Sequence, residues 1–481
     1  MTVNWKSVSR QVTLWFLCTL PLLLYAAQQP AKKPNVLFLF ADDMRADSIG
    51  ALGHPIVKTP NLDALARRGL VFRNAYCLGG NVGAVCTPSR NMMLSGKAYF
   101  RWKDYLTPGA NQNQRGLLAP GDGPSFPLSM KDAGYLTYHH GKRGNTAPHI
   151  QANFEINKYL TNDEADRTVG EPGRQIVDEA IAFLKTNVRQ DARPFFMYLA
   201  FSNPHDPRVA AQKYLDLYDR QKIRVPKNYL PQHPFDNGEM TVRDELLLPW
   251  PRTEAAIRRI HHEYYATISG LDFHIGRLMR ALGELGLDDN TIIIFCADQG
   301  IAIGSHGLLG KQNLYDHSMK APLILAGRGI PRGRSEALVY LLDIYPTVCD
   351  LVGAPLPQGI DGISFKSVIN DKAETVRRDL FLAYRHVQRA WRNDRWKLIR
   401  YPQVNVTQLF DLRNDPDERR NLADDPGQAE RITQMMAKLQ EWQKELGDTA
   451  PLTVDRPQPA AFVPPSGQAL EELKARTRVR R

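Results

Sequence analysis

Short apolar runs alternate with longer segments of helical periodicity along this chain. Five runs rich in β-branched and aromatic residues have the length of buried strands, namely 35–40, 135–140, 194–201, 291–297 and 321–327. Between these runs, apolar residues recur at helical spacing over 61–68, 171–186 and 258–285. The alternation predicts an α/β fold with a mixed, largely parallel sheet flanked by helices.

The pattern changes after residue 369, which separates the expected main α/β domain, 33–369, from a smaller unit. Short strand-like pieces and then helical periodicity over 428–446 predict an α+β subdomain over 370–448 with a short antiparallel sheet. The last segment, 449–481, is rich in proline and ends in basic residues, so we expect an extended or weakly ordered tail. The segment 222–252 has many prolines and aromatic residues without a clear period and is expected to run over the surface.

The first 27 residues have the features of an export signal. Lys6 and Arg10 precede an apolar run over 12–27, and small residues at its end offer a cleavage site. The alternative is an uncleaved anchor, but Pro21 interrupts a run that is short for a membrane span. We therefore expect a periplasmic or secreted mature chain without a membrane span.

The charge balance bears on the kind of partner. The formal net charge is +11, and removal of a leader that carries Lys6 and Arg10 lowers it to +9. A basic exported protein attracts anionic substrates or surfaces by electrostatic steering. Nucleic-acid binding is the rival interpretation, but the basic residues are scattered and form neither a basic helix nor a recognised module. We expect no nucleic-acid partner.

Polar residues follow four of the five expected strands. Asp42 and Asp43 come after the first, Lys142 after the second, His205 after the third, and Asp298 with Gln299 after the fourth. In open α/β sheets, ligands bind outside the carboxyl ends of the strands. The sequence therefore predicts that these four groups meet in one crevice.

The acidic members of this set suggest a metal site. Asp42, Asp43, Asp298 and the amide of Gln299 offer only oxygen ligands, which hard cations such as Ca²⁺ and Mg²⁺ prefer. The alternative is that the Asp42-Asp43 pair begins a turn or caps a helix, as many lone Asp pairs do. The matching Asp298-Gln299 pair favours the metal.

Basic side chains near the same strand ends suggest an anionic substrate. Positive charge and proton donors are available from Arg90, Lys142, His205, Lys311, His306 and His317. A tetrahedral anion bound to a cation and surrounded by such groups fits sulfuryl or phosphoryl transfer. Taken singly, Lys142 and Lys311 would be solvated surface residues, and His317 a polar loop residue.

Cys86 is the remaining singular feature. Cys77, Cys296 and Cys349 are widely spaced from it and show no CxxC pattern, and Cys296 and Cys349 lie in apolar runs typical of packed cysteines. From its own surroundings, Cys86 could be a core residue, half of a disulfide, a metal ligand or a nucleophile. The sequence around Cys86 is more informative than the thiol itself. Cys86-Thr87-Pro88-Ser89-Arg90 is followed by Leu94-Ser95-Gly96.

With this motif, the chain resembles the type I, formylglycine-dependent sulfatases of the alkaline-phosphatase superfamily. The resemblance extends from about residue 34 to about residue 425 and includes "PNVLFLFADDMR", "NPHDP" and "TIIIFCADQG". It implies an alkaline-phosphatase-like fold. It also implies that a maturase oxidises Cys86 to Cα-formylglycine, whose hydrated aldehyde attacks sulfur and forms a covalent sulfate intermediate.

The resemblance also implies roles for the other residues. A metal site for Ca²⁺, in preference to Mg²⁺, would be formed by Asp42, Asp43, Asp298, Gln299 and the modified residue Cys86. Arg90 would hold residue 86, Lys142 and Lys311 would bind the sulfate oxygens, and His205 would protonate the leaving alcohol. His306 is a further candidate for substrate contact.

Two departures from the family pattern concern this site. The family commonly has a His after Gly-Lys-Trp, whereas Lys142 is followed here by Arg143-Gly144-Asn145, so that His140, His149 or His306 would have to replace it. Residue 299 is Gln where the family often has Asn or His, but Gln still offers an amide oxygen.

The sequence thus predicts an exported sulfatase that releases inorganic sulfate, with a sulfated carbohydrate favoured by the basic charge. The loops 99–123 and 222–252 are expected to shape its substrate pocket. The alternatives are a phosphodiesterase or phosphonate monoester hydrolase of the same superfamily, and a non-catalytic protein that binds sulfated glycans with Cys86 unmodified.

Overall fold

The computed structural model describes residues 1–2, 32–102, 123–142, 144–160, 169–187 and 191–479. Pro34–Arg481 form one unit, distinct from Met1–Lys33. The expected export signal lies almost wholly outside the described residues, as does most of the loop 99–123. Within the described ranges, no helix has the length and apolar character needed to cross a membrane.

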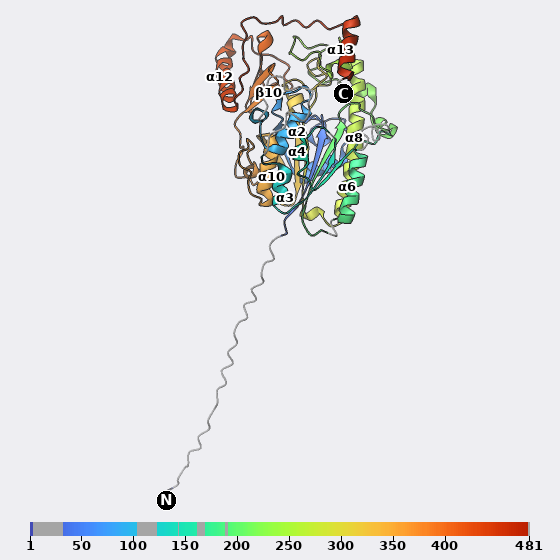
Figure 1. Ribbon diagram of the computed structural model, residues 1–481, viewed down its shortest axis with the longest axis vertical. Coiled ribbons are helices and arrows are strands. Elements are labelled where there is room, and N and C mark those ends of the chain that lie inside the picture. Colours follow the sequence, from blue (N-terminus) through green and yellow to red (C-terminus); the bar gives the residue numbers. More distant parts are fainter. Residues whose placement is uncertain (3–31, 103–122, 143, 161–168, 188–190, 480–481) are drawn as a thin grey trace. The chain divides into compact units, whose positions relative to one another are not determined.

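A large sheet forms the centre of the fold (Figure 1). Its strand order is β5-β4-β6-β1-β7-β8-β2-β9. The bounds are β1 (Asn35–Asp42), β2 (Leu70–Tyr76), β4 (Leu136–Gly141), β5 (Ile156–Tyr159), β6 (Phe195–Pro204), β7 (Thr291–Ala297), β8 (Lys320–Gly327) and β9 (Gly333–Tyr340). Neighbouring strands pair in parallel except at β8, which is antiparallel to both β7 and β2. The predicted mixed, largely parallel sheet is confirmed.

The central strands are apolar because both faces of the sheet are covered. Every residue of β1, β6 and β7 is buried, as continuous Val/Ile/Leu/Phe runs require. The sequence pattern does not single out β2, β5 and β9. The edge strand β9 has an exposed, charged first half, which masks its strand character in the sequence.

Helices cover the two faces of the sheet. α1 (Pro60–Arg68) and α6 (Arg174–Asn187) pack with the long α8 (Glu254–Glu284), while α2 (Cys86–Ser95), α3 (Phe126–Asp132) and α10 (Ile344–Val352) pack with one another (Figure 1). α8 begins four residues before its expected start because the hydroxyl of Thr253 accepts from the main-chain N–H of Ala256. The short helices are α4 (Pro148–Gln151), α7 (Gln212–Leu215), α9 (Asp316–Met319) and α11 (Lys366–Ile369).

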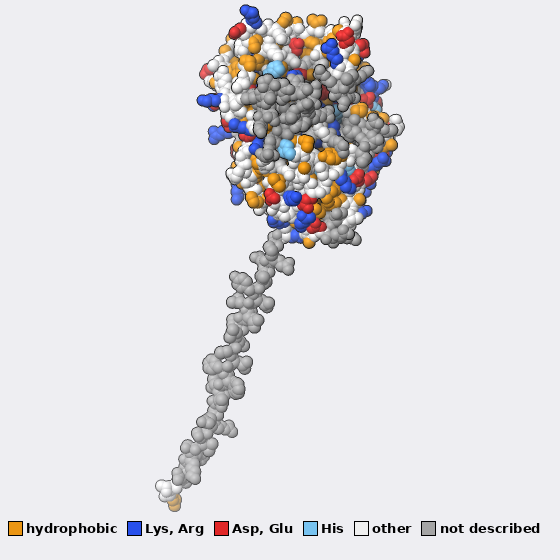
Figure 2. Space-filling model, in the orientation of Figure 1, with side chains coloured by type: hydrophobic (Ala, Val, Ile, Leu, Met, Phe, Trp, Pro, Cys, Tyr) orange, Lys and Arg blue, Asp and Glu red, His pale blue; other side chains and the backbone are white. Residues whose placement is uncertain are grey.

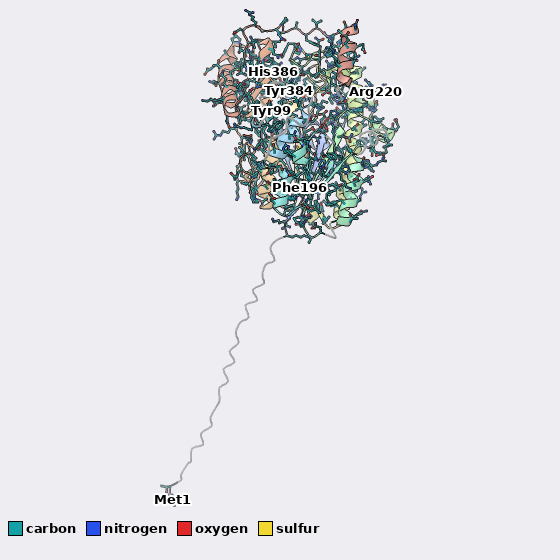
Figure 3. The ribbon with its side chains drawn as sticks, in the orientation of Figure 1. Met1, Tyr99, Phe196, Arg220, Tyr384 and His386 are labelled. Carbon is teal, nitrogen blue, oxygen red and sulfur yellow. The ribbon has the colours of Figure 1, made fainter. Side chains whose placement is uncertain are left out.

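A second, smaller sheet lies in the C-terminal part of the chain. Its order is β13-β12-β11-β10-β3, with bounds β3 (Gly79–Gly80), β10 (Leu380–Tyr384), β11 (Gln388–Arg392), β12 (Trp396–Tyr401) and β13 (Val406–Asp411). β10 to β13 form antiparallel pairs, as expected, whereas β3 joins β10 in parallel. Figure 3 labels Tyr384 of β10, and it shows Tyr99, which follows α2, near Tyr384 in the upper half of the view.

The chain ends in a helix that the sequence analysis does not predict. α12 (Ala429–Leu446) stops at Gly447, which has φ 73°. Residues 449–466 then run without a helix or strand before α13 (Gly467–Val479). The expectation of an extended tail is therefore wrong for 467–479, a segment free of proline in which Glu472 pairs with Gln468 at helical spacing. Figure 2 shows Lys and Arg interspersed with Asp and Glu on the visible face.

The core around Phe196 gives a test of the fold. Phe196 of β6, labelled in Figure 3, is fully buried, and its ring centroid lies 4.5 Å from that of Phe126 on α3. We expect Phe196→Ala to lower the free energy of unfolding by about 3–5 kcal/mol, since it removes a buried ring and leaves a cavity. Urea unfolding followed by circular dichroism measures the change.

The matched control is Phe273→Ala on α8, because the Phe273 side chain is 48% exposed. We expect this substitution to change the free energy of unfolding by less than about 1 kcal/mol. Equal losses for both variants would contradict the assignment of β6 to the core.

Candidate active site

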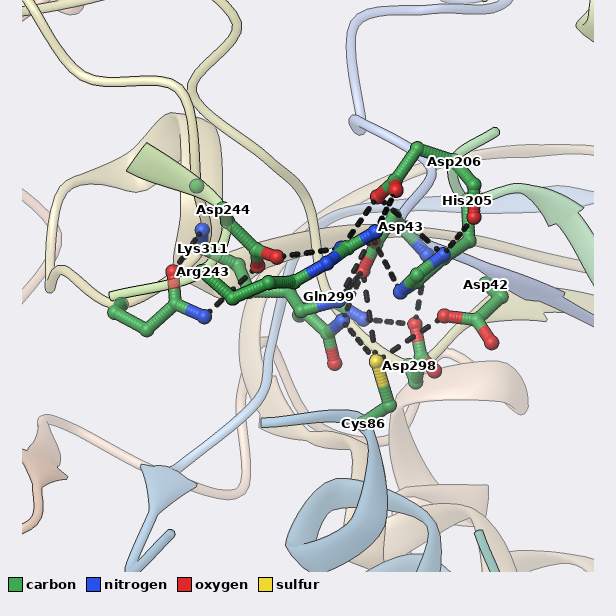
Figure 4. A network of polar contacts seen from close by, with 12 residues as sticks. Asp42, Asp43, Cys86, His205, Asp206, Arg243, Asp244, Asp298, Gln299 and Lys311 are labelled. Carbon is green, nitrogen blue, oxygen red and sulfur yellow. Dashed lines mark hydrogen bonds and ion pairs between the residues drawn. The ribbon is translucent and has the colours of Figure 1, made fainter. Parts of the chain in front are cut away.

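Four adjacent parallel strands, β4, β6, β1 and β7, deliver the candidate residues to one edge of the large sheet. Lys142 follows β4, His205 follows β6, Asp42 ends β1 beside Asp43, and Asp298 follows β7. Figure 4 shows Asp42, Asp43, His205 and Asp298 together at this edge. The structure thus has the convergence that the sequence predicts.

Cys86 lies at the centre of this group as the first residue of α2. Its side chain is 2% exposed, and its Sγ lies 3.1 Å from Oδ1 of Asp42 and 3.2 Å from Nε2 of Gln299. Burial, with the negative charges of Asp298 and Asp42, raises the pKa of the Cys86 thiol well above its usual value. The thiol is therefore held protonated and is unsuited to act as a thiolate nucleophile.

The residues after Cys86 fix α2 against the sheet. The hydroxyl of Ser89 donates to the main-chain oxygen of Asp298 over 2.5 Å. Arg90 Nε donates to Oδ2 of Asp298 over 3.0 Å, and its Nη2 lies 3.3 Å from Oδ2 of Asp42. Arg90 is 1% exposed, so its charge depends on these two carboxylates. The motif therefore positions Cys86 as well as surrounding it.

Two lysines complete the charge balance. Lys142 Nζ lies 2.8 Å from Oδ2 of Asp42, and Lys311 Nζ lies 2.8 Å from both carboxylate oxygens of Asp43. Burial disfavours the charged form of Lys311, but the adjacent Asp43 carboxylate keeps its pKa well above the usual value. Three buried carboxyl groups thus face three cations, each of which offsets the charge of a carboxylate partner.

The carboxylates differ in their protonation. Burial alone would raise the pKa of Asp42, yet Lys142 and Arg90 hold it well below its usual value. For Asp298, burial and the neighbouring charge of Asp42 raise the pKa to about 7. Asp298 also accepts the main-chain N–H groups of Asp43 and Gln299, at 2.9 and 3.0 Å.

The donor set fits a hard divalent cation. One ligand atom from each of Asp42, Asp43, Cys86 and His205 lies within 4.8 Å of the others. Gln299 Oε1 is buried and finds no hydrogen-bond partner among the described residues. The amide directs its Nε2 at Asp43 Oδ1 and Cys86 Sγ, at 2.6 and 3.2 Å, so a half-turn of the amide would bring the unpartnered oxygen to the carboxyl groups and complete the oxygen set that Ca²⁺ or Mg²⁺ prefers.

His205 faces the same cluster. Its Nε2 lies 3.7 Å from Oδ2 of Asp43, while Nδ1 lies 2.6 Å from the main-chain oxygen of Asp206. A carbonyl oxygen only accepts, so Nδ1 is the donor and Nε2 is the nitrogen directed at the site. Burial, with the positive charges of Lys142 and Lys311, lowers the pKa of His205.

The comparison with protein families agrees with this geometry. A model described as "Sulfatase" matches residues 34–354, which include every residue placed in the cluster. The chain belongs to the sulfatase family. A second model, described as "N-sulphoglucosamine sulphohydrolase, C-terminal", matches residues 304–445 of this sulfatase.

Relatives of this sulfatase match over most of their length. The choline-sulfatase of Rhizobium meliloti is 29% identical, over 82% of this chain and 83% of the relative. The N-acetylglucosamine-6-O-sulfatase of Bacteroides thetaiotaomicron is 26% identical, over 88% of each chain. The named relatives are sulfatases, and the chain is accordingly a sulfuric ester hydrolase.

Solved structures share the fold of this sulfatase. A protein solved in complex with its substrate D-glucosamine-2-N,6-O-disulfate has a TM-score of 0.71 and 23% identity, covering 88% of this chain and 99% of the other. The phosphonate monoester hydrolase of Agrobacterium radiobacter has a TM-score of 0.71 and 22% identity, covering 86% of this chain and 96% of the other. These likenesses support the alkaline-phosphatase-like architecture.

His306 does not join the cluster in this sulfatase. Its Nε2 lies 2.8 Å from the main-chain oxygen of Glu418 and its Nδ1 lies 3.1 Å from Nε2 of His317. The His306 ring stacks on Tyr315 with centroids 3.9 Å apart. The contacts of His306 are thus those of a buried structural residue, and the structure gives no support to the substrate contact expected for it.

The missing family histidine has no evident replacement among the described residues. The polar contacts of Cys86 are with Asp42, Asp43 and Gln299. His140 belongs to β4, where its Nδ1 lies 3.9 Å from Glu179 and burial lowers its pKa to about 4. His149 lies on the short helix α4.

Three further residues that are not predicted from the sequence belong to the site. Arg243 and Asp244 come from the segment 222–252, and Asp206 follows His205. Arg243 and Asp244 approach His205 and Lys311, and Asp206 lies between Arg243 and His205 (Figure 4). Asp206 is signalled by the "NPHDP" run. Arg243 and Asp244 carry no signal, because their segment has no period and their partners are distant in sequence.

Cation binding at this site is testable through stability. Protein freed of metal with EDTA should gain about 2.7 kcal/mol of stability when Ca²⁺ is added at one hundred times its Kd. Asp43→Asn should abolish this gain, because it removes a carboxylate. Asn also tolerates the φ of 64° at position 43. Differential scanning calorimetry with and without Ca²⁺ measures both.

Asp394→Asn is the control, since Asp394 pairs with Arg413 in an exposed ion pair. This variant should keep the full Ca²⁺-dependent gain. A gain that persists in Asp43→Asn would place the cation elsewhere.

Proposed function

We propose that this sulfatase is exported and releases inorganic sulfate from a sulfated carbohydrate, with Ca²⁺ and a formylglycine at position 86. The observation that carries the proposal is the position of Cys86. Its protonated thiol lies where three carboxylates and three cations meet, at the start of a helix fixed by Ser89 and Arg90.

The chain's own residues define the roles around position 86. Formylglycine would supply an oxygen nucleophile as its hydrated aldehyde, and a cation held by Asp42, Asp43, Asp298 and Gln299 would lower the pKa of that hydroxyl. Lys142 and Lys311 offer ammonium groups to the sulfate oxygens. His205 presents Nε2 to the same space and, once this nitrogen is also protonated, would give that proton to the leaving alcohol. Arg90 holds Asp42 and Asp298 in place.

A sulfated sugar is the substrate class best supported. The relative from Bacteroides thetaiotaomicron is named for the 6-O-sulfate of N-acetylglucosamine, and the solved structure with 23% identity contains a disulfated glucosamine. The C-terminal family model is that of a sulfohydrolase acting on N-sulfoglucosamine. The formal charge of +9 that remains after loss of Lys6 and Arg10 with the leader also favours a polyanionic glycan over a small monoanionic ester.

Burial of Cys86 sets the order of maturation. At 2% exposure, its side chain is out of reach of another enzyme in the folded protein. The proposed maturase must therefore act before the chain folds. The chain is unfolded during the export that the expected leader directs, and the maturation step can occur at that stage.

Peptide mass spectrometry tests the modification. In protein made by its native host, the tryptic peptide that contains residue 86 should have the mass of an aldehyde in place of the thiol. Cys86→Ser should lower kcat for sulfate release by more than about a thousand-fold, because a serine adduct cannot eliminate sulfate. An intact thiol in active protein, or full activity in Cys86→Ser, would contradict the proposal.

Competing assays test the substrate class. Sulfate release from sulfated glucosamine and glycan oligosaccharides should exceed turnover of matched phosphonate monoesters and phosphodiesters in kcat/KM. Faster turnover at phosphorus would favour the phosphonate monoester hydrolase alternative. Binding of sulfated glycans without turnover, by protein with an intact thiol, would indicate a non-catalytic glycan-binding protein.

A further inference from the structure

Three consecutive residues of the irregular segment 222–252, Arg243, Asp244 and Glu245, contact the two loops that carry His205 and Lys311. Asp244 and Glu245 are buried, and the Arg243 side chain is 25% exposed at the edge of the site. Their acidic and basic groups have no part in the chemistry assigned above. Their contacts divide into two arms.

The first arm leads from Arg243 to His205. The guanidinium of Arg243 binds both carboxylate oxygens of Asp206, with Nη1 2.9 Å from Oδ1. Asp206 in turn holds the ring of His205. The Nδ1 of His205 donates to the main-chain oxygen of Asp206 over 2.6 Å and lies 3.5 Å from Oδ1 of Asp206. Arg243 thereby restrains the residue that orients Nε2 of His205 toward the site.

The second arm leads from Glu245 to Lys311. The Glu245 carboxylate accepts the main-chain N–H groups of Leu309 and Gly310, at 3.0 and 2.8 Å, and pairs on its other side with Arg252. These N–H groups immediately precede Lys311. A Cβ at position 310 would lie 3.2 Å from Oε1 of Glu245 and 2.9 Å from Cβ of Asp244, so glycine permits this close approach.

Asp244 joins the two arms and extends them to Cys86. Its Oδ1 accepts from Arg243 Nη1 over 2.7 Å, and its Oδ2 accepts from Gln312 Nε2 over 2.8 Å. Gln312 Nε2 also donates to the main-chain oxygen of Gly83 over 2.9 Å, in the loop that leads into α2. One stretch of chain is thus bonded to the loops that position His205, Lys311 and Cys86.

We propose that Arg243, Asp244 and Glu245 are positioning residues, Arg243 setting His205 for proton transfer to the leaving group and Glu245 setting Lys311 for the sulfate. The inference rests on the proposed function. It assigns separate consequences to the two arms. Loss of the Arg243 arm impairs leaving-group protonation, whereas loss of the Glu245 arm impairs binding of the anion.

Leaving-group dependence tests the first arm. A nitrophenolate departs without a proton, whereas a sugar alkoxide needs one from His205. In Arg243→Gln, kcat for a sugar sulfate should fall about ten-fold more than kcat for 4-nitrophenyl sulfate, with KM little changed. Arg243→Lys keeps the charge but not the bidentate contact with Asp206. Its kcat for the sugar sulfate should therefore lie between the values of Arg243→Gln and the native protein.

Inhibition by inorganic sulfate tests the second arm. In Glu245→Gln, the inhibition constant of sulfate and the KM for 4-nitrophenyl sulfate should both rise about ten-fold, with the ratio of the two kcat values unchanged. Because Glu245 pairs with the buried Arg252, this variant can fail to fold. Asp244→Asn, checked for native melting temperature, then provides the sulfate-inhibition readout through Gln312 and the Lys311 loop, without the ratio of kcat values because Asp244 also contacts Arg243.

Arg413→Gln is the control, because Arg413 forms an exposed ion pair with Asp394. It should leave both readouts unchanged. Equal losses on the two esters in Arg243→Gln, or unchanged sulfate inhibition in Glu245→Gln and in Asp244→Asn, would overturn the inference. Absence of sulfate release by the native protein would instead refute the proposed function, so the two failures are distinguishable.

Discussion

Three buried carboxylates, each opposed by a cation from another part of the chain, hold the functional end of this protein together. Asp42, Asp43 and Asp298 lie at the carboxyl ends of β1 and β7, and their partners are Arg90 of α2, Lys142 after β4 and Lys311 of a distant loop. Removing one member of such a buried set leaves an uncompensated charge, which costs about 3–5 kcal/mol. The same ion pairs therefore fix α2 against the sheet and define the site.

This arrangement also suits a reaction on a singly charged sulfate ester. The lysines that offset Asp42 and Asp43 are the groups that its sulfate would meet, and a divalent cation among the carboxylates would add the positive charge that offsets the released sulfate dianion. Cys86 lies between the two sets of charge. Its buried, protonated thiol has no useful reactivity of its own, which accords with its serving as the precursor of an oxygen nucleophile.

The site is more predictable from the sequence than its supports are. Continuous apolar runs mark β1, β4, β6 and β7, and the polar residues after them meet because those strands are parallel neighbours. β9 and α13 are not found, since an edge strand is half polar and a short terminal helix has weak periodicity. The contacts of His306 with Glu418 and His317 could not be predicted, because a loop histidine gives no sign of its partners in the sequence. Arg243 is missed because its role depends on tertiary contacts alone.

A crystal structure of the exported protein, made by its native host and soaked with Ca²⁺ and inorganic sulfate, would show the chemical state of residue 86 and the ligands of both ions together. We expect a hydrated aldehyde at residue 86 and a cation bound by the oxygens of Asp42, Asp43, Asp298 and Gln299. We also expect a sulfate in contact with Lys142, Lys311 and His205. An unmodified thiol at residue 86, with the cation and the sulfate bound away from these residues, would contradict the proposed function.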